Sequence, residues 1–537
     1  MDINIKNTRK SLLRYIWEDT EEINDILYLC AFRYFAARRD YEQMLNVLLN
    51  YPLMLPEDIS EFLLHTLDET ELPEAIEEDE RGCLSLMKDS FAPRFLIDVG
   101  RYEDAEMRAL AALSHHRDSN APFASLVLLS CYNNLAYVKM HSALKTHTYD
   151  FSRYAKAAAD IVAKTRAPIA LPESLSYAGV RSFACFVGVG AESGEFEQFL
   201  CEIGLLVECM SQMFPGQYAG YDDLCACEIA FYRFKKADAK NCAVRAIEKA
   251  ADANQYETGA RAIFYMLRIA VMEGTYELAE NMFGKLSEVT EKPAYIYGRT
   301  AYDFVSAYFF SLLSIKALIP PRFLLFPDIV IADTNIPTAE YMTNIRCLLA
   351  SKKYSDALAA LHLYNTIGDS GRFLLDELTR MIFYAVAHYG LGNKKEALAY
   401  FESAYEHSQN GELIMPFIEF GRSTRGLVKL ALEYPGGAIP RDWLTHLDVH
   451  ASAYAKKVAL IAAGFRRKYG IEDEIRLSER EIQLLGDIYQ GLSRQEIAAT
   501  RYLSINTIKT ELKNLYAKLD VNSAVEAVRI ANELDLL

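Results

Sequence analysis

The sequence predicts an all-α protein in which stacked helical hairpins form a superhelix, followed by a four-helix domain. Three observations support this fold class. A short turn motif that starts an amphipathic segment recurs about every 40 residues between residue 1 and about residue 430. The alternation of apolar and polar residues that is typical of strands is almost absent there. The last segment, residues 476–537, contains four short amphipathic stretches with their own start and stop signals.

The repeated motif consists of a Gly or basic residue, an aromatic residue, an acidic residue and then an Ala at the start of a new helix. Copies of it begin at Arg39, Gly100, Gly194, Gly274, Lys353 and Gly392. The marker alanines of four hairpins are 40, 78 and 40 residues apart: Ala239, Ala279, Ala357 and Ala397. This spacing predicts one degenerate repeat between residues 279 and 357. The period resembles that of tetratricopeptide repeats, so we predict a tetratricopeptide-like repeat domain over residues 1–433.

Side-chain size explains the motif. The small Ala lets the second helix of a hairpin press against the first, and the aromatic residue fills the groove at the turn. Most of the 34 Tyr and 27 Phe are therefore expected in the core, and some Tyr on a concave face would suit a small ligand or a peptide. Residues 317–340, which include Pro320 and Pro321, interrupt the pattern and are expected to form a longer excursion between hairpins.

Composition indicates a folded, soluble protein. Apolar residues make up 51% of the chain and charged residues 24%, which excludes wholesale disorder. The formal net charge of −16 argues against broad attraction of the repeat domain to nucleic acid or acidic membranes. The most apolar stretch, Phe304–Ile315, is shorter than the ~20 residues of a membrane span and is expected to be a buried helix. With no signal peptide recognisable at the N-terminus, we expect a cytoplasmic protein without membrane association.

No pattern in the sequence indicates catalysis, a metal site or a cofactor. The scattered Cys residues are expected to be reduced thiols, and the closest pair, Cys225 and Cys227, lacks the further ligands of a zinc site. His446 and His450 are one helical turn apart, but the Glu that follows the first His in a metalloprotease motif is missing. We expect both to be exposed helix residues, and we expect the protein not to be an enzyme.

Residues 434–475 are expected to connect the repeats to the C-terminal domain. They contain a helical stretch from about 442 to 464 and then the basic run Arg466–Gly470. Two interpretations of the basic run stay open, namely additional contacts to nucleic acid and a soluble linker.

The C-terminal domain, residues 476–537, carries strong helix signals. Three hydroxyl caps precede a carboxylate by three residues: Ser478 with Glu481, Ser493 with Glu496, and Ser523 with Glu526. Gly491 is expected to end the first helix, and Leu503-Ser504 to form a tight turn before the third. Four short helices with a brief turn between the second and third are typical of a helix-turn-helix domain.

The third helix of this domain has two distinct faces. Apolar residues recur at steps of three and four and are expected to form a buried stripe: Ile505, Ile508, Leu512, Leu515 and Leu519. The opposite face carries Asn506, Lys509, Thr510 and Lys513, and the two lysines are one turn apart. Such a short cationic face with hydrogen-bonding side chains suits a helix that enters the major groove of DNA.

The C-terminal residues also resemble a known family. The strings Leu477-Ser478-x-Arg480-Glu481, Gly491-Leu492-Ser493-x-x-Glu496-Ile497-Ala498, Thr507-Ile508-Lys509-Thr510 and Asn514-Leu515-Tyr516-x-Lys518-Leu519 are similar to the LuxR-type DNA-binding domain. The resemblance implies that Lys509, Thr510 and Lys513 face base edges and nearby phosphates, and that Arg494 and Thr507 contact the DNA backbone. Ser504, Asn506 and Asn514 complete the predicted DNA-binding residues. Promoter DNA and RNA polymerase are the implied partners, with a homodimer or larger oligomer on DNA.

A second resemblance lies just before the connecting segment. Met415–Gly421 and Leu427–Leu430 are similar to the end of the repeat domain in MalT-like regulators, which are large LuxR-type activators. Such regulators usually begin with a nucleotide-binding domain, but the chain has no Gly-x-x-x-x-Gly-Lys-Ser/Thr motif. The predicted function is therefore a DNA-binding transcription regulator without ATP-driven assembly, whose repeats sense a small molecule or a protein partner.

Four positions depart from the LuxR pattern: Arg501 replaces a buried Leu, Glu511 a His, Asp520 a Gly or Asn, and Ala524 an Arg. Because burial of an unpaired guanidinium is costly, Arg501 is expected to snorkel or to find a partner. Glu511 is expected to bring negative charge towards phosphate. The domain has eight basic and nine acidic residues, which predicts weak electrostatic affinity of one copy for DNA. These features leave an alternative open, namely a repeat-based protein-interaction adaptor whose terminal domain no longer reads DNA.

Overall fold

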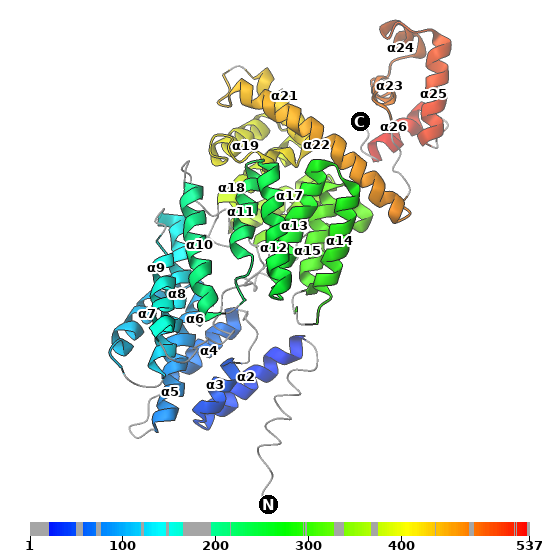
Figure 1. Cartoon of the computed structure of the whole chain (residues 1–537). Coiled ribbons are helices and arrows are strands. Elements are labelled where there is room, and N and C mark those ends of the chain that lie inside the picture. Colours follow the sequence, from blue (N-terminus) through cyan, green and yellow to red (C-terminus); the bar gives the residue numbers. More distant parts are fainter. Residues whose placement is uncertain are drawn as a thin grey trace, which may run out of the picture. The chain divides into compact units, whose positions relative to one another are not determined.

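The chain forms two compact units in the computed structural model, residues 1–462 and residues 463–537. The structure describes residues 21–49, 57–70, 77–119, 123–146, 150–164, 195–214, 216–293, 295, 298–326, 338–366, 374–434, 436–471, 477–519, 521 and 523–533. Within these ranges every regular element is a helix and no strand occurs (Figure 1). The all-α prediction is thus confirmed, whereas the predicted domain limits at residues 433 and 475 stay predictions.

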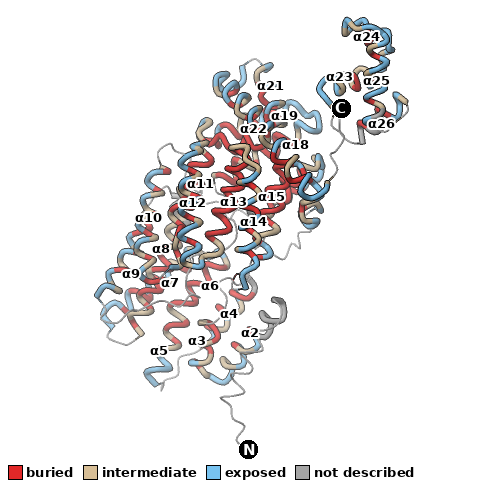
Figure 2. Tube along the Cα trace, turned by 45° about the vertical axis from the view of Figure 1, so that its right-hand side comes forward, coloured by how far each residue is buried: buried red, intermediate tan, exposed pale blue. Residues whose placement is uncertain are grey.

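The first unit is built from helices that pack on their neighbours in the chain. Its first half contains α2 (Glu21–Ala37), α3 (Tyr41–Leu49), α4 (Glu57–Glu69), α5 (Glu78–Leu86), the π-helical turn η1 (Met87–Phe91), α6 (Ala92–Asp98), α7 (Tyr102–His116), α8 (Ala124–Thr146), α9 (Ser152–Lys164) and α10 (Glu195–Met213). Its second half contains α11 (Tyr221–Tyr232), α12 (Lys236–Asp252), α13 (Tyr256–Glu273), α14 (Tyr276–Thr290), α15 (Gly298–Leu312), α16 (Thr338–Ala350), α17 (Tyr354–Thr366), α18 (Leu374–Gly390), α19 (Lys394–His407), α20 (Met415–Ile418) and α21 (Gly421–Glu433). Consecutive pairs such as α11 with α12 and α13 with α14 lie in contact, and Figure 2 shows α13 buried along most of its length.

The copies of the turn motif in the described residues share one backbone geometry, whereas Gly194, where another predicted copy begins, lies outside them. A residue with a left-handed φ ends the first helix, for example Gly274 at +81° or Lys352 at +57°. The next amide then donates to the carbonyl five residues earlier, as from Thr275 to Ala270 at 3.1 Å. This arrangement satisfies carbonyls that the helix end leaves free, and Gly adopts the required φ without strain. The four marker alanines, all on the second helix of a hairpin, are fully buried: Ala239, Ala279, Ala357 and Ala397.

One repeat keeps the turn but not the second helix. α15 ends in the same geometry, with Ser314 at φ +52° and the Ile315 amide donating to the Phe310 carbonyl at 3.0 Å. Pro320 and Pro321 then prevent a continuous helix, and the 3-10 turns η3 (Lys316–Leu318) and η4 (Pro321–Leu324) take its place. This is the degenerate repeat predicted between residues 279 and 357. The two 3-10 turns lie at the start of the predicted excursion over residues 317–340. Residues 327–337 of this excursion lie outside the described part of the chain.

The apolar stretch Phe304–Ile315 lies mostly in α15, as predicted for a buried helix. Phe304, Phe309 and Phe310 are all buried, and they pack against Phe264 or Phe283 of the preceding hairpin. None of the helices in the described part of the chain is both long and apolar enough to span a membrane.

A buried ion pair lies among five elements of the first unit. Arg268 on α13 donates from Nε and Nη2 to the two carboxylate oxygens of Glu419, at 2.9 and 2.8 Å. Tyr308 on α15 donates to the same carboxylate at 2.8 Å, and Tyr232 on α11 lies 3.1 Å from Nη1 of Arg268. Arg346 on α16 donates to the Glu419 main-chain carbonyl at 3.4 Å. Because these partners are up to 151 residues apart in the chain, the network fixes how successive hairpins meet the segment after α20.

The helix that follows, α22 (Arg441–Lys468), corrects the prediction for the connecting segment. The expected helix at 442–464 continues through Arg466–Lys468. The first three residues of the basic run Arg466–Gly470 therefore form the last turn of α22. Gly470 at φ +62° ends the helix, and the Ile471 amide donates to the Arg466 carbonyl at 2.9 Å. Gly464, where the helix was expected to end, keeps the helical conformation, and Phe465 directly after it is fully buried, which favours continuation of the helix as far as Gly470.

Candidate nucleic-acid interface

The second unit contains the helices α23 (Glu479–Tyr489), α24 (Arg494–Thr500), α25 (Ile505–Leu519) and α26 (Ala524–Glu533). Their apolar sides form one core: Leu484, Leu485, Ile497, Ala498, Ile508, Leu512, Leu515, Leu519, Ala527 and Ala531. The predicted stripe of α25 is therefore buried, except at its first residue. Ile505, the first residue of the helix, is 42% exposed.

Two capping boxes start α23 and α24 as predicted. The Ser478 hydroxyl accepts a bond from the Glu481 amide at 3.3 Å, and the Glu481 carboxylate accepts one from the Ser478 amide at 2.7 Å. Ser493 and Glu496 repeat this geometry with the same two distances. The amide and hydroxyl of Ser493 hold the pKa of the Glu496 carboxyl below its ordinary value. Both helices thus begin at defined residues, which fixes where their side chains project.

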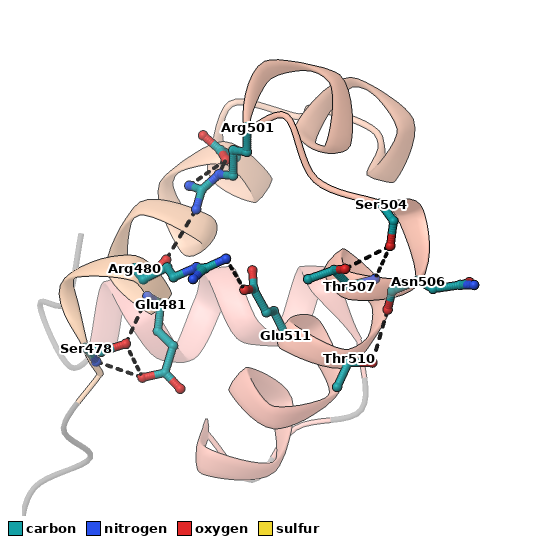
Figure 3. A network of polar contacts seen from close by, with 10 residues as sticks. Ser478, Arg480, Glu481, Arg501, Ser504, Asn506, Thr507, Thr510 and Glu511 are labelled. Carbon is teal, nitrogen blue, oxygen red and sulfur yellow. Dashed lines mark hydrogen bonds and ion pairs between the residues drawn. The ribbon is translucent and has the colours of Figure 1, made fainter.

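The turn between α24 and α25 places a further capping residue, Ser504, at the start of α25. Tyr502 has a left-handed φ of +54°, and the Leu503 amide donates to the Ala498 carbonyl at 3.0 Å. Ser504 caps α25, because its hydroxyl accepts a bond from the Thr507 amide at 3.0 Å and lies 2.8 Å from the Thr507 hydroxyl. These two predicted DNA-binding residues are thus also the residues that begin the helix (Figure 3).

The other predicted DNA-binding side chains are exposed together on α25 and at the start of α24. Five of them lie on the solvent side of α25: Asn506, Lys509, Thr510, Lys513 and Asn514. Arg494 is the exposed first residue of α24. The Thr510 hydroxyl donates to the Asn506 carbonyl at 3.0 Å, whereas the Asn506 side chain points away from the domain in Figure 3. The five α25 residues thus share one exposed face of the helix, and Arg494 is exposed at the start of the preceding helix.

Three ion pairs join α23 to the rest of the domain. Arg480 lies 2.8 Å from Glu511 and Lys518 lies 2.8 Å from Glu481, both between α23 and α25. Asp487 lies 2.7 Å from Arg501, which caps the C-terminus of α24. Sequence reasoning missed Arg480 and Asp487 as partners, because pairing across helices has no signal in the local sequence.

These ion pairs show which partners are contacted by two of the four residues that depart from the LuxR pattern. Arg501 finds a partner, as expected, and its side chain is 15% exposed. The expectation that Glu511 faces phosphate is wrong: its carboxylate turns towards Arg480 on α23 and is 21% exposed. Ala524 is the exposed first residue of α26, whose start is capped by the Ser523 hydroxyl at 3.2 Å from the Glu526 amide. Asp520 lies outside the described residues.

The ion pairs also determine which charges of the domain are neutralised within it. Glu481, Asp487 and Glu511 are each neutralised by a cation within the domain. Among the described residues, Lys509 and Lys513 have no ion-pair partner, so the exposed side of α25 is locally positive although the domain is near neutral overall. A near-neutral domain can therefore present a cationic face to a polyanion.

The sequence of the second unit matches a known family. Residues 476–531 match the family of bacterial regulatory proteins of the LuxR type. The C-terminal unit contains a LuxR-type helix-turn-helix domain. Over 199 residues, 35% of this chain and 22% of the relative, the chain is 24% identical to the HTH-type transcriptional regulator MalT of Vibrio parahaemolyticus. Over 58 residues, 11% of this chain and 6% of the relative, it is 47% identical to the HTH-type transcriptional regulator MalT of Serratia proteamaculans. The chain thus matches about a fifth of the length of the first relative.

Proposed function

We propose that the chain is a transcription regulator whose LuxR-type domain binds promoter DNA through α25. The observation that carries this proposal is the uncompensated pair Lys509 and Lys513 on the exposed face of a helix that is capped and packed as in a helix-turn-helix domain. The similarity of parts of the chain to MalT regulators supports the same function.

The residues of α25 have separate roles in this proposal. The N-terminal half of the helix enters the major groove, where Asn506 and Thr510 offer hydrogen bonds to base edges and Lys509 and Lys513 approach bases and phosphates. Arg494, Thr507, Ser504 and Asn514 contact the sugar-phosphate backbone at the edges of this surface. Two free lysines give weak electrostatic affinity, so two or more linked copies bind a promoter, as a homodimer or larger oligomer.

The first unit receives the signal in this proposal. Its hairpins carry many partly exposed aromatic side chains, such as Tyr400 and His388, whose rings stack at 5.5 Å between centroids. Such flat surfaces suit a small molecule or a segment of a partner protein. Binding shifts the population of the first unit's conformations, and RNA polymerase is the partner that reads the result at the promoter.

Genome-wide capture of DNA fragments with the full chain tests the DNA-binding part. The wild-type protein is compared with the double variant Lys509→Ala/Lys513→Ala and with a control, Lys394→Ala/Lys395→Ala, which removes two exposed lysines from α19. We expect a small set of sharp sites with the wild type and the control, and none with the Lys509/Lys513 variant. Equal capture by all three proteins contradicts the assignment of α25. No capture by any of them supports an interaction adaptor instead.

A further inference from the structure

α22 contacts a different part of the first unit at almost every turn. Trp443 donates from its indole nitrogen to the Gly411 carbonyl at 3.2 Å, and Asp448 pairs with Arg425 of α21 at 3.0 Å. Further along, Tyr454 is buried. Lys457 donates to the Met272 carbonyl at the end of α13, at 2.7 Å. α22 therefore stays docked only while these separate contacts hold.

Two histidines lie in the middle of this line of contacts. The Nε2 atoms of His446 and His450 are 2.9 Å apart, and their ring centroids are 4.3 Å apart. His446 is exposed, but His450 is half-buried, with its ring 4.7 Å from that of Phe234 in the turn between α11 and α12. The expectation that both histidines are exposed is thus wrong for His450, because α22 lies against this turn.

The contact between the two rings requires a particular protonation state. A hydrogen bond between two Nε2 atoms needs one N–H donor and one unprotonated acceptor. Protonation of the acceptor removes the bond and places two positive charges at hydrogen-bond distance. The docked geometry is therefore compatible with at most one charged ring in the pair.

The surroundings add positive charge rather than negative charge. Lys236 at the start of α12 lies over the Phe234 ring at 4.5 Å, and Lys457 follows on α22. Burial, then the neighbouring His446, Lys236 and Lys457, lower the pKa of His450 below its ordinary value.

The nearby carboxylates already have cationic partners. On α13, Glu273 is 2.8 Å from Lys240, and Asp448 on α22 pairs with Arg425. Arg233, in the same turn as Phe234, pairs with Glu197 and Glu412. These carboxylates are thus each engaged by a cation, and Asp442, one helical turn before His446 on α22, is exposed to water, which screens its charge.

We propose that His446 and His450 form a proton-sensitive latch that holds α22 against the turn between α11 and α12 at neutral pH and releases it as the pH falls. In the released helix the His450 ring is in water, where the pKa of His is about 6.5, so release takes up a proton. By linkage, docking weakens as the pH falls below about 6.5 and levels off below the lowered pKa of His450 in the docked helix.

The position of the latch gives it a consequence for the whole chain. α22 continues without interruption through residues 463–468, which belong to the second unit. Protons are therefore a signal that acts on the helix leading to the DNA-binding domain. This inference does not depend on the proposed DNA function, because docking of α22 is measurable without DNA.

The experiment uses the full chain and hydrogen exchange of residues 441–462, compared between pH 7.5 and 5.5 after correction for the intrinsic exchange rate. We expect the docking equilibrium to weaken by up to about tenfold per pH unit for each proton taken up, within the window below about 6.5. The double variant His446→Gln/His450→Gln keeps hydrogen-bonding side chains but no titrating ring, and should lose this dependence. The control His65→Gln removes an exposed histidine of α4, and should keep it.

Two results overturn the proposal: the same pH dependence in the double variant and the wild type, or no dependence in the wild type. A titration of the histidine rings by NMR covers the case in which the double variant does not fold. We expect the His450 ring of the wild type to titrate below its ordinary pKa. If His450 titrates near pH 6.5, like a histidine in water, the latch does not exist.

Discussion

Replacement of Glu419 by Gln would test the buried network of the first unit. The wild-type carboxylate accepts two bonds from Arg268 and one from Tyr308. Side chains of Arg268 and Glu419 are only 1% and 2% exposed. Glu419→Gln keeps the size and one oxygen of the side chain but leaves the guanidinium of Arg268 buried without a counter-charge.

The expected loss of stability follows from this burial. Removal of one partner of a buried ion pair costs about 3–5 kcal/mol. Five aromatic rings lie within 4.3 to 5.2 Å of the Arg268 guanidinium, and their attraction to the cation is worth about 0.5–2 kcal/mol. We therefore expect a loss near the lower limit, about 3 kcal/mol. The double variant Arg268→Met/Glu419→Leu should recover much of it, because neither charge is then buried alone.

The same network predicts a pH dependence. Burial by itself raises the pKa of Glu419, but Arg268, Arg346 and Tyr308 together hold it below its ordinary value. The carboxylate therefore contributes stability that is fully present above the unfolded pKa of about 4.3 and is lost as the pH falls through the folded pKa. The difference between wild type and Glu419→Gln should shrink in that acidic window.

Urea denaturation of the full chain, followed by far-UV circular dichroism at pH 7 and 25 °C, measures the loss. Glu273→Gln serves as the control, because it breaks the partly exposed pair with Lys240 and should cost no more than about 1 kcal/mol. If Glu419→Gln and Glu273→Gln shift the midpoint equally, the reasoning about the buried charge is refuted.

Three further predictions concern single contacts. Lys509→Ala/Lys513→Ala should make the slope of the logarithm of the DNA-binding constant against the logarithm of the salt concentration shallower by about 2, since each phosphate contact contributes about 0.9. Fluorescence anisotropy with a captured promoter fragment measures this slope, and an unchanged slope would place both lysines away from DNA. Asp487→Asn should destabilise the LuxR-type domain by about 1–3 kcal/mol in thermal unfolding, because Nε of Arg501 loses a charged bond of 2.7 Å; an unaltered melting temperature would show that Arg501 needs no partner. Gly220→Ala should cost about 1–3 kcal/mol in urea denaturation, since φ is +80° and the added Cβ would lie 2.7 Å from the Ala246 carbonyl oxygen; an unchanged midpoint would mean that the backbone relaxes there.

Local signals were sufficient for much of the fold. The caps Ser478 and Ser493, the breaker Gly491 and the apolar steps of α25 act within one or two helical turns, so the sequence alone predicted the helices of the LuxR-type domain. The period of the marker alanines likewise predicted a degenerate repeat between residues 279 and 357, because each hairpin must contribute one buried small residue to its neighbour.

Contacts between distant residues were decided only by the tertiary structure. The sequence placed Glu511 beside the DNA-contact surface, but the neighbouring helix α23 turns its charge towards Arg480. Arg268 and Glu419 are 151 residues apart, and His450 meets Phe234 only because α22 lies against an earlier turn. Spacing along one chain determines which side chains share a helix face. Which charge neutralises which, and therefore where free charge remains, depends on the packing of helices that no local pattern specifies.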